Sequence, residues 1–489
     1  MFLTAALTIG GAVLLGLAAR RDEKPPLQIL GGLALVGSAA LLHLTGPQPI
    51  LYSLGYASAE LGAGLLIMAG MLAGRKEGAR SFFLLGVGAM AIGVVIIVAR
   101  SIYMPQVTLL VELGPDDTFD EIAPLVAYYD GVAERAFPMV DLTENEDLAQ
   151  VYLIRLPKDC RDALKKFLEL DTENVDNVEA NIAMGLDLPE TQELDYEARA
   201  EVLENDPLVG SQWGLDAIHA HEAHALLADL EPVRKASIAI VDTGVDAGHE
   251  DMTAIFEDSP GSTDRHGHGT HCAGIAGAAT NNGLGVASLN WEGRFVSIRS
   301  YSALGDNGMG TLESIAEALI EAAEAGADVI SMSLGGQSPI IPKTMVDAVN
   351  YARSKGSIII VAAGNSNVDA SNNIPSNVEG VIAVGAVNER LAKAPFSNTT
   401  GRLSRPISAP GTNILSLKPT GGYVRLSGTS MATPMVSGLA GVMRALNPDL
   451  EADEIYEILR DTGRSTGASS AVGQMIDAEA AIQAVLNDA

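Results

Sequence analysis

Residues 264–274 read DRHGHGTHCAG, so three histidines lie within six positions, beside an aspartate and a cysteine. An imidazole can carry a proton during catalysis or can bind a metal ion, so His266, His268 and His271 fit either chemistry. The local pattern does not distinguish a catalytic histidine from a metal ligand. The rest of the sequence has to decide between these two roles.

Other polar residues stand where segments typical of strands end or where helices begin. IAIVDTGVD places Asp242 directly after an apolar run, VAAGNSN places Asn365 after another, and LSGTSMATPMVSGLAGVM places Ser430 at the start of a helical pattern. His268 opens a further small-residue helix. Nucleophilic acyl transfer needs a hydroxyl, a base, a carboxylate that orients the base, and donors for the oxyanion. These residue types supply all of them.

The elements that must position these residues alternate between strand and helix patterns. Four near-continuous apolar runs predict strands covered on both faces: SIAIV (237–241), DVISMSL (328–334), SIIIVAA (357–363) and GVIAVGAV (380–387). TLESIAEALIEAAEAG (311–326) has helical spacing and ends in glycine. We therefore expect a doubly wound α/β domain with a parallel sheet, in which chemistry gathers at the carboxyl ends of the strands.

Seven segments of this part resemble the subtilisin-like serine proteases in sequence and in order. They are DTGVDAGHEDM (242–252), HGHGTHCAGIAG (266–277), ISMSLGG (330–336), IVAAGNSN (360–367), FSNTTG (396–401), ISAPG (407–411) and GTSMATPMVSGLAG (428–441). The order Asp, His, Ser is that of subtilisin, itself a standard example of this triad. The resemblance implies a subtilisin-like catalytic domain over 207–489.

The resemblance implies a role for each matching residue. Ser430 would be the nucleophile, His268 its general base, and Asp242 the carboxylate that orients the imidazole. The Asn365 amide and the Ser430 backbone N–H would form the oxyanion hole. The residues expected to bind the peptide are Ser333, Leu334, Gly335 and Gly336, beside the primary specificity pocket, and Gly308 and Gly310, along the edge that pairs with an extended substrate.

The same resemblance makes His268 the catalytic member of the histidine cluster, with His271 packed in its helix and His266 at the rim. Cys272 is expected to be a buried, unpaired core residue rather than a reactive thiol. Asp246, His249 and Asp251 either bind an ion or form a solvated turn. Members of the family often hold structural Ca²⁺, but TNNGLGVAS (280–288) is shorter than the loop of the strong calcium site in the best-known members. Metal ligands therefore stay unassigned, and the chemistry itself requires no cofactor.

Residues 105–183 show the order strand, helix, two strands, helix, strand, which predicts a ferredoxin-like (split βαβ) α+β domain. Its strands are expected at 107–113, near 133–140, at 147–156 and near 173–182. It resembles the family's propeptide, which assists folding and inhibits the enzyme; an unrelated accessory domain is the alternative. Residues 184–206 carry eight acids against one arginine and predict an exposed acidic linker, within which self-cleavage would fall.

The first hundred residues contain four long apolar stretches, about 1–19, 27–46, 50–73 and 81–99. Each is near the roughly 20 residues that a helix needs to cross a bilayer, so we expect four transmembrane helices. Basic residues lie between the first and second stretches and between the third and fourth, which places these loops in the cytoplasm and the catalytic domain outside it. Glu60 is the exception: it is either a buried polar partner, an acid that faces other helices, or a sign that the third stretch does not cross, and in that last case the domain would be cytoplasmic.

Charge restricts the partners. The chain has 31 basic and 61 acidic residues, and the first hundred hold only 7 and 4 of them. The remainder is therefore strongly acidic, which argues against nucleic acid and anionic lipid as ligands. Polypeptide substrates, the inhibitor-like domain and the membrane remain as expected partners. The two cysteines, Cys160 and Cys272, fall in different domains, so no disulfide is expected.

Together these patterns predict a serine endopeptidase that is made as a membrane-anchored zymogen facing outside the cytoplasm. Self-cleavage within about 183–206 would release a soluble protease. The alternative function is a membrane-tethered pseudoprotease or sensor whose fold only binds peptides. The presence of Asp242, His268, Asn365 and Ser430 together argues for the enzyme, because a binding module does not need all four groups.

Overall fold

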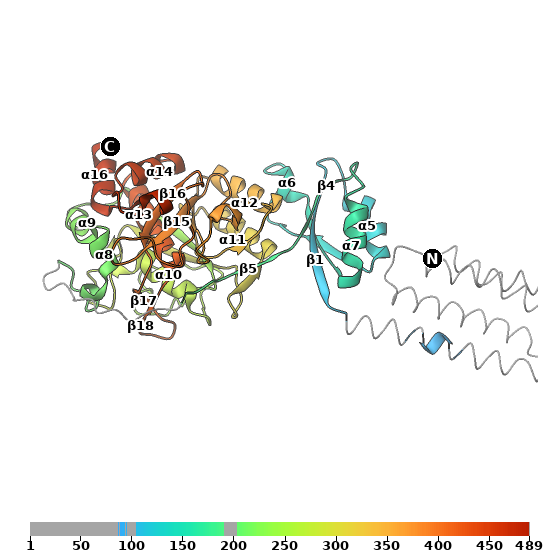
Figure 1. The fold of residues 1–489 in the computed structure, drawn as a ribbon, viewed down its shortest axis with the longest axis horizontal. Helices are drawn as coiled ribbons and strands as arrows, with labels where there is room; N and C mark the ends of the chain where they lie inside the picture. The colour runs from blue at the N-terminus through green and yellow to red at the C-terminus, as the bar shows by residue number, and fades with distance from the viewer. Residues whose placement is uncertain (1–86, 88, 93, 95–103, 190–202, 489) are drawn as a thin grey trace, which may run out of the picture. The chain divides into compact units, whose positions relative to one another are not determined.

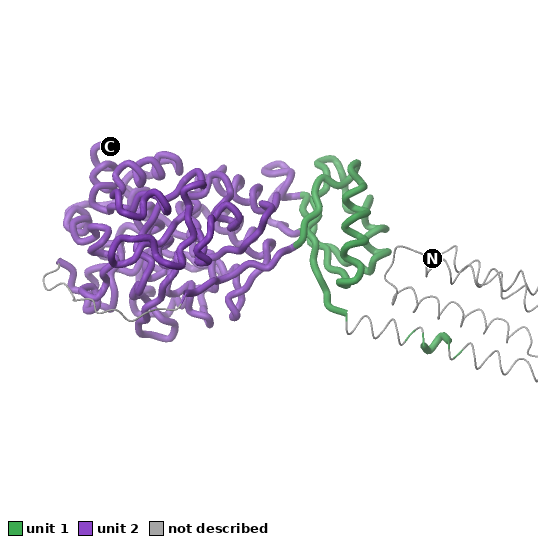
Figure 2. Tube along the Cα trace, in the orientation of Figure 1, with its two compact units in different colours: residues 1–135, 150–180 green, residues 136–149, 181–489 purple. Residues whose placement is uncertain are grey.

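The structure is a computed structural model that describes residues 104–189 and 203–488, together with 87, 89–92 and 94 (Figure 1). The chain divides into two compact units, which Figure 2 colours separately; the second contains 136–149 and everything after 180. No helix among the described residues is long and apolar enough to cross a membrane. The four predicted membrane stretches lie outside the described residues, apart from a few positions of the fourth.

The first unit is a four-stranded antiparallel sheet with two helices. Its elements are β1 (Gln106–Leu113), α5 (Phe119–Tyr128), β2 (Val132–Arg135), β3 (Val151–Pro157), a 3-10 turn (Lys158–Cys160), α7 (Arg161–Leu168) and β4 (Val175–Ala180). The strand order is β2-β3-β1-β4. Thr118 and Glu121 cap α5 reciprocally, and Leu164 and Leu168, four residues apart, bury one face of α7. Both helices contribute to one apolar core with the sheet.

Two strands of this region differ from the sequence expectation. β2 ends at Arg135 rather than near residue 140, and Pro138, which lacks a backbone N–H, follows shortly after. The stretch 147–156 begins as the short helix α6 (Glu146–Ala149), which belongs to the second unit, and becomes strand only from Val151.

The second unit is built on a seven-stranded parallel sheet in the order β19-β16-β15-β13-β11-β6-β9. The strands are β6 (Ala236–Asp242), β9 (Val296–Ser302), β11 (Val329–Met332), β13 (Ile358–Ala362), β15 (Ile382–Val387), β16 (Pro406–Pro410) and β19 (Gln474–Met475). Every residue of β6, β11, β13 and β15 is buried, as the continuous apolar runs require. The predicted α/β fold with a parallel sheet is confirmed.

Two pairs of long helices cover the sheet. α10 (His268–Gly277) packs with α13 (Thr429–Leu446), and α11 (Leu312–Glu324) packs with α12 (Lys343–Ser354) (Figure 1). The other helices are α8 (Trp213–Ala217), α9 (Ala220–Leu227), α14 (Ala452–Asp461), α15 (Ser469–Val472) and α16 (Ala478–Asp488), with 3-10 turns at Val209–Ser211 and Ala370–Asn372. The core of this unit runs along α10, α13 and the sheet.

Short strand pairs complete the second unit at its edges. They are β5 (Ala183–Gly185) with β10 (Met309–Thr311), β7 (Ala279–Thr280) with β8 (Asn290–Trp291), β12 (Gly336–Gln337) with β14 (Asn373–Ile374), and β17 (Ile414–Leu417) with β18 (Tyr423–Leu426).

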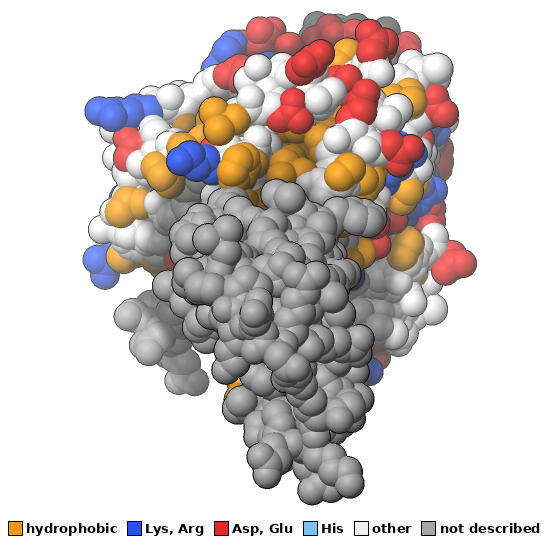
Figure 3. Space-filling model, turned by 90° about the vertical axis from the view of Figure 1, so that its right-hand side faces the viewer, with side chains coloured by type: hydrophobic (Ala, Val, Ile, Leu, Met, Phe, Trp, Pro, Cys, Tyr) orange, Lys and Arg blue, Asp and Glu red, His pale blue; other side chains and the backbone are white. Residues whose placement is uncertain are grey.

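Acidic side chains are prominent on the face in Figure 3, in keeping with the net charge of −30.

The ends of the acidic segment correct one expectation. The sequence predicts an exposed linker over residues 184–206, yet Met184 is buried within β5, and Glu204 and Asp206 are buried in the second unit. Asp206 accepts hydrogen bonds from the backbone of Asn281 and Asn282. Both ends of the segment are thus part of the folded unit, and its middle, 190–202, lies outside the described residues.

The order in which the chain adds strands to the parallel sheet reverses at β6. β9 follows β6 in the chain and lies on one side of it, whereas β11 comes later and lies on the other. Neighbouring connections therefore leave in opposite directions at this point, which opens a crevice at the carboxyl end of the strand. Asp242, the last residue of β6, stands at this edge.

The central helix α13 is buried along its whole length, and it approaches α10 closely. A Cβ at Gly438 would lie 2.6 Å from the backbone oxygen of Ala276, so only glycine allows this separation. Because α10 begins with His268 and α13 with residues 429 and 430, this contact fixes the distance between two chemically important helix ends.

We expect Gly438→Ala to lower the free energy of unfolding by about 1–3 kcal/mol, because the added methyl group forces the two helices apart. Gly467→Ala is the matched control, since nothing lies within 4 Å of a Cβ there. Both tryptophans of the chain, Trp213 and Trp291, lie in this unit, so urea denaturation followed by their fluorescence reports on it. Equal midpoints for the two variants would contradict the close-contact argument.

Candidate active site

Asp242 and His268 form a fully buried pair at the carboxyl edge of the sheet. The Nδ1 atom of His268 lies 2.8 Å from Oδ1 and 2.9 Å from Oδ2 of Asp242. Burial by itself lowers the pKa of His268, but the adjacent Asp242 carboxylate raises it, and the net effect places the pKa well above its usual range. A carboxylate at Nδ1 also fixes the tautomer in which Nε2 can accept a proton.

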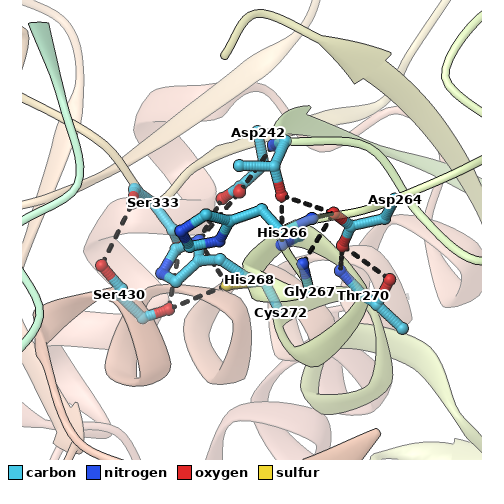
Figure 4. Close-up of polar contacts among 11 residues, drawn as sticks. Asp242, Asp264, His266, Gly267, His268, Thr270, Cys272, Ser333 and Ser430 are labelled. Carbon is cyan, nitrogen blue, oxygen red and sulfur yellow. Dashed lines mark hydrogen bonds and ion pairs between the residues drawn. The ribbon is translucent and has the colours of Figure 1, made fainter. Parts of the chain in front are cut away.

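Asp264 holds the start of α10 in position. Its Oδ1 accepts hydrogen bonds from the backbone of His266 and Gly267, at 3.0 and 2.8 Å. Its Oδ2 accepts from the backbone and the hydroxyl of Thr270, at 2.9 and 2.7 Å. The carboxylate therefore bonds N–H groups just before and within the first turn of the helix whose first residue is His268 (Figure 4).

Thr243 connects this cap to the strand. Its hydroxyl donates to Asp264 Oδ1 at 3.0 Å and accepts from the backbone N–H of Gly269 at 3.0 Å. A Cβ at Gly269 would lie 2.1 Å from the backbone oxygen of Gly244, so the helix meets the loop after β6 backbone to backbone. The approach of α10 to β6 is thereby set by short polar contacts.

Ser430 enters from the N-terminal turn of α13, beside His268 (Figure 4). Its hydroxyl donates to the backbone oxygen of Ser333 at 3.1 Å, and in the described part of the chain the buried Nε2 of His268 has no hydrogen-bond partner. Pro434, four residues on, has no N–H to bond the Ser430 carbonyl, which instead accepts from Ser333 Oγ at 2.9 Å. The structure thus brings serine and histidine together without the hydrogen bond between them.

Asn365 follows β13 and is oriented by Thr429. Both the backbone N–H and the hydroxyl of Thr429 donate to Asn365 Oδ1, at 2.8 and 2.9 Å. With its oxygen held in this way, the Asn365 amide N–H₂ group points toward the groove beside Ser430. There it donates to the backbone oxygen of Asp187.

Residues 183–187 lie in that groove as an extended strand. β5 pairs antiparallel with β10, with Met184 opposite Gly310. On the same side, the Leu186 N–H donates to the backbone oxygen of Gly308, just before β10, at 3.1 Å. On the other side, the N–H and the oxygen of Gly185 bond with Gly335 at 3.0 and 3.1 Å. The predicted peptide-binding residues Gly308, Gly310 and Gly335 therefore all contact a peptide backbone, and Met184 packs against Gly336.

The pocket at the end of this strand contains the remaining predicted residues. It is lined by Ser333, Leu334, Gly335 and Gly336 on one wall and by residues of the Asn365 loop and Ser430 on the other. Asp187 also lines it, and its Oδ2 accepts from the hydroxyl of Ser366 at 3.3 Å. The Asp187 carbonyl thus lies against the Asn365 amide, in a pocket that Ser430 also lines.

Sequence and structure comparisons agree with this geometry. The pattern of the subtilase family (Peptidase_S8) matches residues 234–475. Thermitase of Thermoactinomyces vulgaris is 40% identical over 247 residues, which cover 49% of this chain and 84% of thermitase. Subtilisin BL of Lederbergia lenta is 34% identical over 275 residues, 55% of this chain and 97% of that protein. The chain belongs to the subtilase family.

Two further relatives extend the likeness. The solved structure of proteases from Pseudoalteromonas arctica PAMC 21717 has a TM-score of 0.52 and 28% identity, and covers 58% of this chain and 99% of that one. An alkaline protease of Shouchella clausii is 33% identical, and the alignment covers 64% of this chain and 78% of that protein. The aligned part of this chain is therefore longer than residues 207–489. The chain is a subtilisin-like serine endopeptidase.

Of the other two histidines in the 266–271 cluster of this subtilase, His266 is exposed, and His271 differs from His268 in its contacts. His271 is fully buried, its Nε2 lies 3.1 and 3.0 Å from the backbone oxygens of Ile414 and Val424, and burial lowers its pKa to about 3. It therefore stays neutral and ties α10 to the β17–β18 hairpin. Cys272 is buried and unpaired, 3.9 Å from His268 Nδ1, and burial raises the pKa of its thiol. A structural role suits both residues.

The acids considered for an ion are engaged in protein contacts. Asp246 accepts from the backbone of Gly248 and Thr420, and Asp251 accepts from the backbone of Val286 and the Asn282 amide. His249 and Asp251 are buried, so the solvated turn expected there is wrong for both. Because these carboxylates already accept hydrogen bonds from the protein, their geometry does not identify them as calcium ligands.

Sequence reasoning did not identify Asp264, Thr243 and Thr429 as parts of the site. Thr243 and Thr429 adjoin Asp242 and Ser430, so their positions were available, but their hydrogen bonds depend on the approach of β6, α10 and α13. Asp264 lies four residues before His268, next to the three histidines in the sequence. Its position at a helix start was the signal that could have marked it as a cap.

We expect Asp242→Asn to lower turnover by about 10⁴-fold, the order of magnitude measured for loss of the corresponding aspartate in subtilisin. The change also removes the charge that raises the His268 pKa, so burial dominates and the pKa falls. Since the base must be unprotonated, the acid limb of the pH–rate profile should move to lower pH. Profiles of kcat/KM on a fluorogenic peptide measure both effects.

Asp306→Asn is the control for this prediction, because it removes an exposed acid that pairs only with Arg265 in the structure. Its profile should match the wild type. An acid limb at unchanged pH in Asp242→Asn would show that Asp242 does not set the protonation of the base.

Proposed function

We propose that this subtilase hydrolyses peptide bonds with Ser430 as nucleophile, His268 as general base and Asp242 as the carboxylate that orients and stabilises the imidazole. The observation that carries the proposal is the meeting of the Asp242–His268 pair, Ser430 and the Asn365 amide at the end of one extended peptide strand. Each group has the chemistry its role requires.

The reaction begins with a rotation of the Ser430 side chain. Its hydroxyl leaves the Ser333 carbonyl and turns toward His268 Nε2, which has a lone pair to accept the proton. The serine oxygen then attacks the carbonyl carbon of the substrate, the C–N bond breaks, and His268 returns the proton to the leaving nitrogen. Water hydrolyses the acyl-enzyme by the same route in reverse, and Ser430 regains its proton.

The Asn365 amide and the Ser430 backbone N–H stabilise the oxyanion. Thr429 holds the Asn365 oxygen with two hydrogen bonds, so the amide is preorganised and needs no rearrangement when charge develops. Ser430 N–H stands in the first turn of α13, where the helix dipole places partial positive charge. Loss of the amide would cost about 10²–10³ in turnover, a magnitude known from subtilisin itself.

In the zymogen, the enzyme's own chain occupies the site. The contacts of Gly185, Leu186 and Asp187 give this segment the position of a substrate whose scissile bond is Asp187–Leu188. Asn181 and Ile182 add support, because the Asn181 side chain and the Ile182 carbonyl accept from the free N–H groups of Glu313 and Leu312 at the start of α11. Self-cleavage there would give a new N-terminus at Leu188.

The unit before this segment acts as the propeptide-like inhibitor. Its order β-α-β-β-α-β and its sheet order β2-β3-β1-β4 fit a split βαβ domain. The alignment with the alkaline protease must begin before residue 207, so part of the chain before the catalytic unit also has a counterpart in that protein. Cys160 lies buried in this unit and Cys272 in the other.

The four apolar stretches before residue 100 anchor the zymogen in a membrane, with the catalytic unit outside the cytoplasm. The basic loops between the stretches support this orientation, and the acidic surface suits a domain kept away from anionic lipid. Cleavage at Asp187–Leu188 cuts the only covalent link between the catalytic unit and this anchor, and therefore releases a soluble protease.

Wild-type and Ser430→Ala chains expressed in membranes test this proposal through the size of the products and the N-terminus of any soluble fragment. We expect a fragment that starts at Leu188 in the wild type only. A wild-type fragment that starts elsewhere would contradict the assigned bond, and full-length chains in both cases would contradict self-release.

Gly185→Val and Ala183→Val provide a matched pair for the position of the segment. A Cβ at Gly185 would lie 2.5 Å from the Gly308 oxygen and 2.6 Å from Met309 Sδ, whereas Ala183 is exposed. We expect Gly185→Val to slow processing at least tenfold, while Ala183→Val processes at the wild-type rate. Equal rates would show that this segment is not bound as the structure has it when cleavage occurs.

A further inference from the structure

Glu204, His221 and His224 form a buried cluster whose residues do not line the peptide groove. Glu204 lies on the segment that enters the catalytic unit, and both histidines lie on α9. The side chains of Glu204 and His224 are fully buried, and that of His221 is 7% exposed. One ligand atom from each residue lies within 4.8 Å of the others.

The two imidazoles converge on one carboxylate oxygen. The Nδ1 atom of His221 lies 2.9 Å from Glu204 Oε1, and the Nδ1 atom of His224 contacts the same oxygen. The other carboxylate oxygen, Oε2, is buried and has no hydrogen-bond partner among the described residues. A buried carboxylate oxygen without a donor is costly, so the cluster provides more acceptor capacity than the protein uses.

Each ring is held from behind by a second partner. His224 Nε2 lies 2.7 Å from the Ser288 backbone oxygen, and His221 Nε2 lies 3.4 Å from Asp216 Oδ1. Metal-binding histidines characteristically donate their outer N–H to a carbonyl or a carboxylate in this way, which fixes the tautomer and turns the inner lone pair toward the ion.

The fixed tautomer of His224 decides what the cluster must contain. Because a carbonyl only accepts, Nε2 carries the hydrogen, and in the neutral ring Nδ1 then presents a lone pair to the Glu204 carboxylate. Two lone pairs cannot face each other at contact distance in a buried site without a positive charge between them. That charge is either a second proton on His224 or one cation shared by all three residues.

We propose that Glu204, His221 and His224 bind one divalent transition-metal ion with the preferences of Zn²⁺. Two imidazole nitrogens and a carboxylate oxygen are ligands that Zn²⁺ accepts at about 2.0–2.2 Å, with water as the fourth ligand in tetrahedral geometry. The unsatisfied Oε2 favours the shared ion over a second proton on His224, because a proton at Nδ1 would satisfy Oε1 alone. The Trp291 ring, 5.6 Å from His224, contributes an apolar wall.

The ion would join the start of the catalytic unit to α9. Glu204 lies near the end of the acidic segment, and Asp206, two residues later, bonds to the loop at 281–282. Binding to the folded state alone stabilises it in proportion to the logarithm of the ion concentration, so the site would fasten the new N-terminal region after processing. This inference does not depend on the catalytic proposal.

Full-length Ser430→Ala protein, purified without a histidine tag and dialysed against chelator, tests the site. After Zn²⁺ is restored, we expect one Zn²⁺ per chain by metal analysis. We also expect a higher unfolding temperature than for the chelated protein, as measured by tryptophan fluorescence. Co²⁺ in its place should give the visible absorption of a tetrahedral site, which reports on the ligands and not on stability. Absence of stoichiometric Zn²⁺ and of the Co²⁺ bands would overturn the proposal in favour of a protonated cluster.

Glu204→Gln and His221→Gln should each lower the Zn²⁺ affinity at least tenfold and weaken the Co²⁺ bands. His219→Gln is the matched control, because His219 adjoins the same helix and bonds to Asp477 rather than to the cluster. Its affinity should equal that of the parent chain. If all three variants keep the parent affinity, the ion binds elsewhere and the assigned ligands are wrong.

Discussion

The buried contact between Asp242 and His268 is the interaction on which the rest of the site depends. Both side chains are removed from water, where an unpaired carboxylate would be very costly. The structure compensates for this cost at short range, since the backbone of Thr243 donates to Asp242 Oδ1 at 2.7 Å and His268 supplies the remaining donor. The pair can form only if α10 begins where β6 ends.

That requirement explains the chemistry of the surrounding residues. Asp264 caps α10, Thr243 bridges cap and strand, and Gly269 and Gly438 let backbones approach where any side chain would intervene. The same helix packing brings α13 and Ser430 to the pair. The arrangement of Asp242, His268 and Ser430 is therefore produced by contacts between three elements, and no single element contains it.

The sequence predicted those parts of the molecule that local pattern controls. Continuous apolar runs defined β6, β11, β13 and β15, and polar residues at their ends defined the edge where Asp242 and Asn365 lie. Burial of Glu204 and Asp206 could not be predicted, because their acidic neighbours give the segment the composition of an exposed linker, and only tertiary contacts with α9 and the 281–282 loop bury them. The contact between the Asp187 carbonyl and the Asn365 amide likewise follows from strand pairing with β10 and Gly335. The composition of the segment does not predict this pairing.

The central claim is that Ser430 is a nucleophile activated by His268, and covalent labelling tests it most directly. A fluorophosphonate probe reacts with an activated serine, and mass spectrometry locates the adduct. We predict a single adduct on Ser430, formed faster as the pH rises past the His268 pKa and lost in His268→Ala. An unlabelled Ser430 in folded protein whose peptide groove is free, or labelling that persists in His268→Ala at the same rate, would contradict the account.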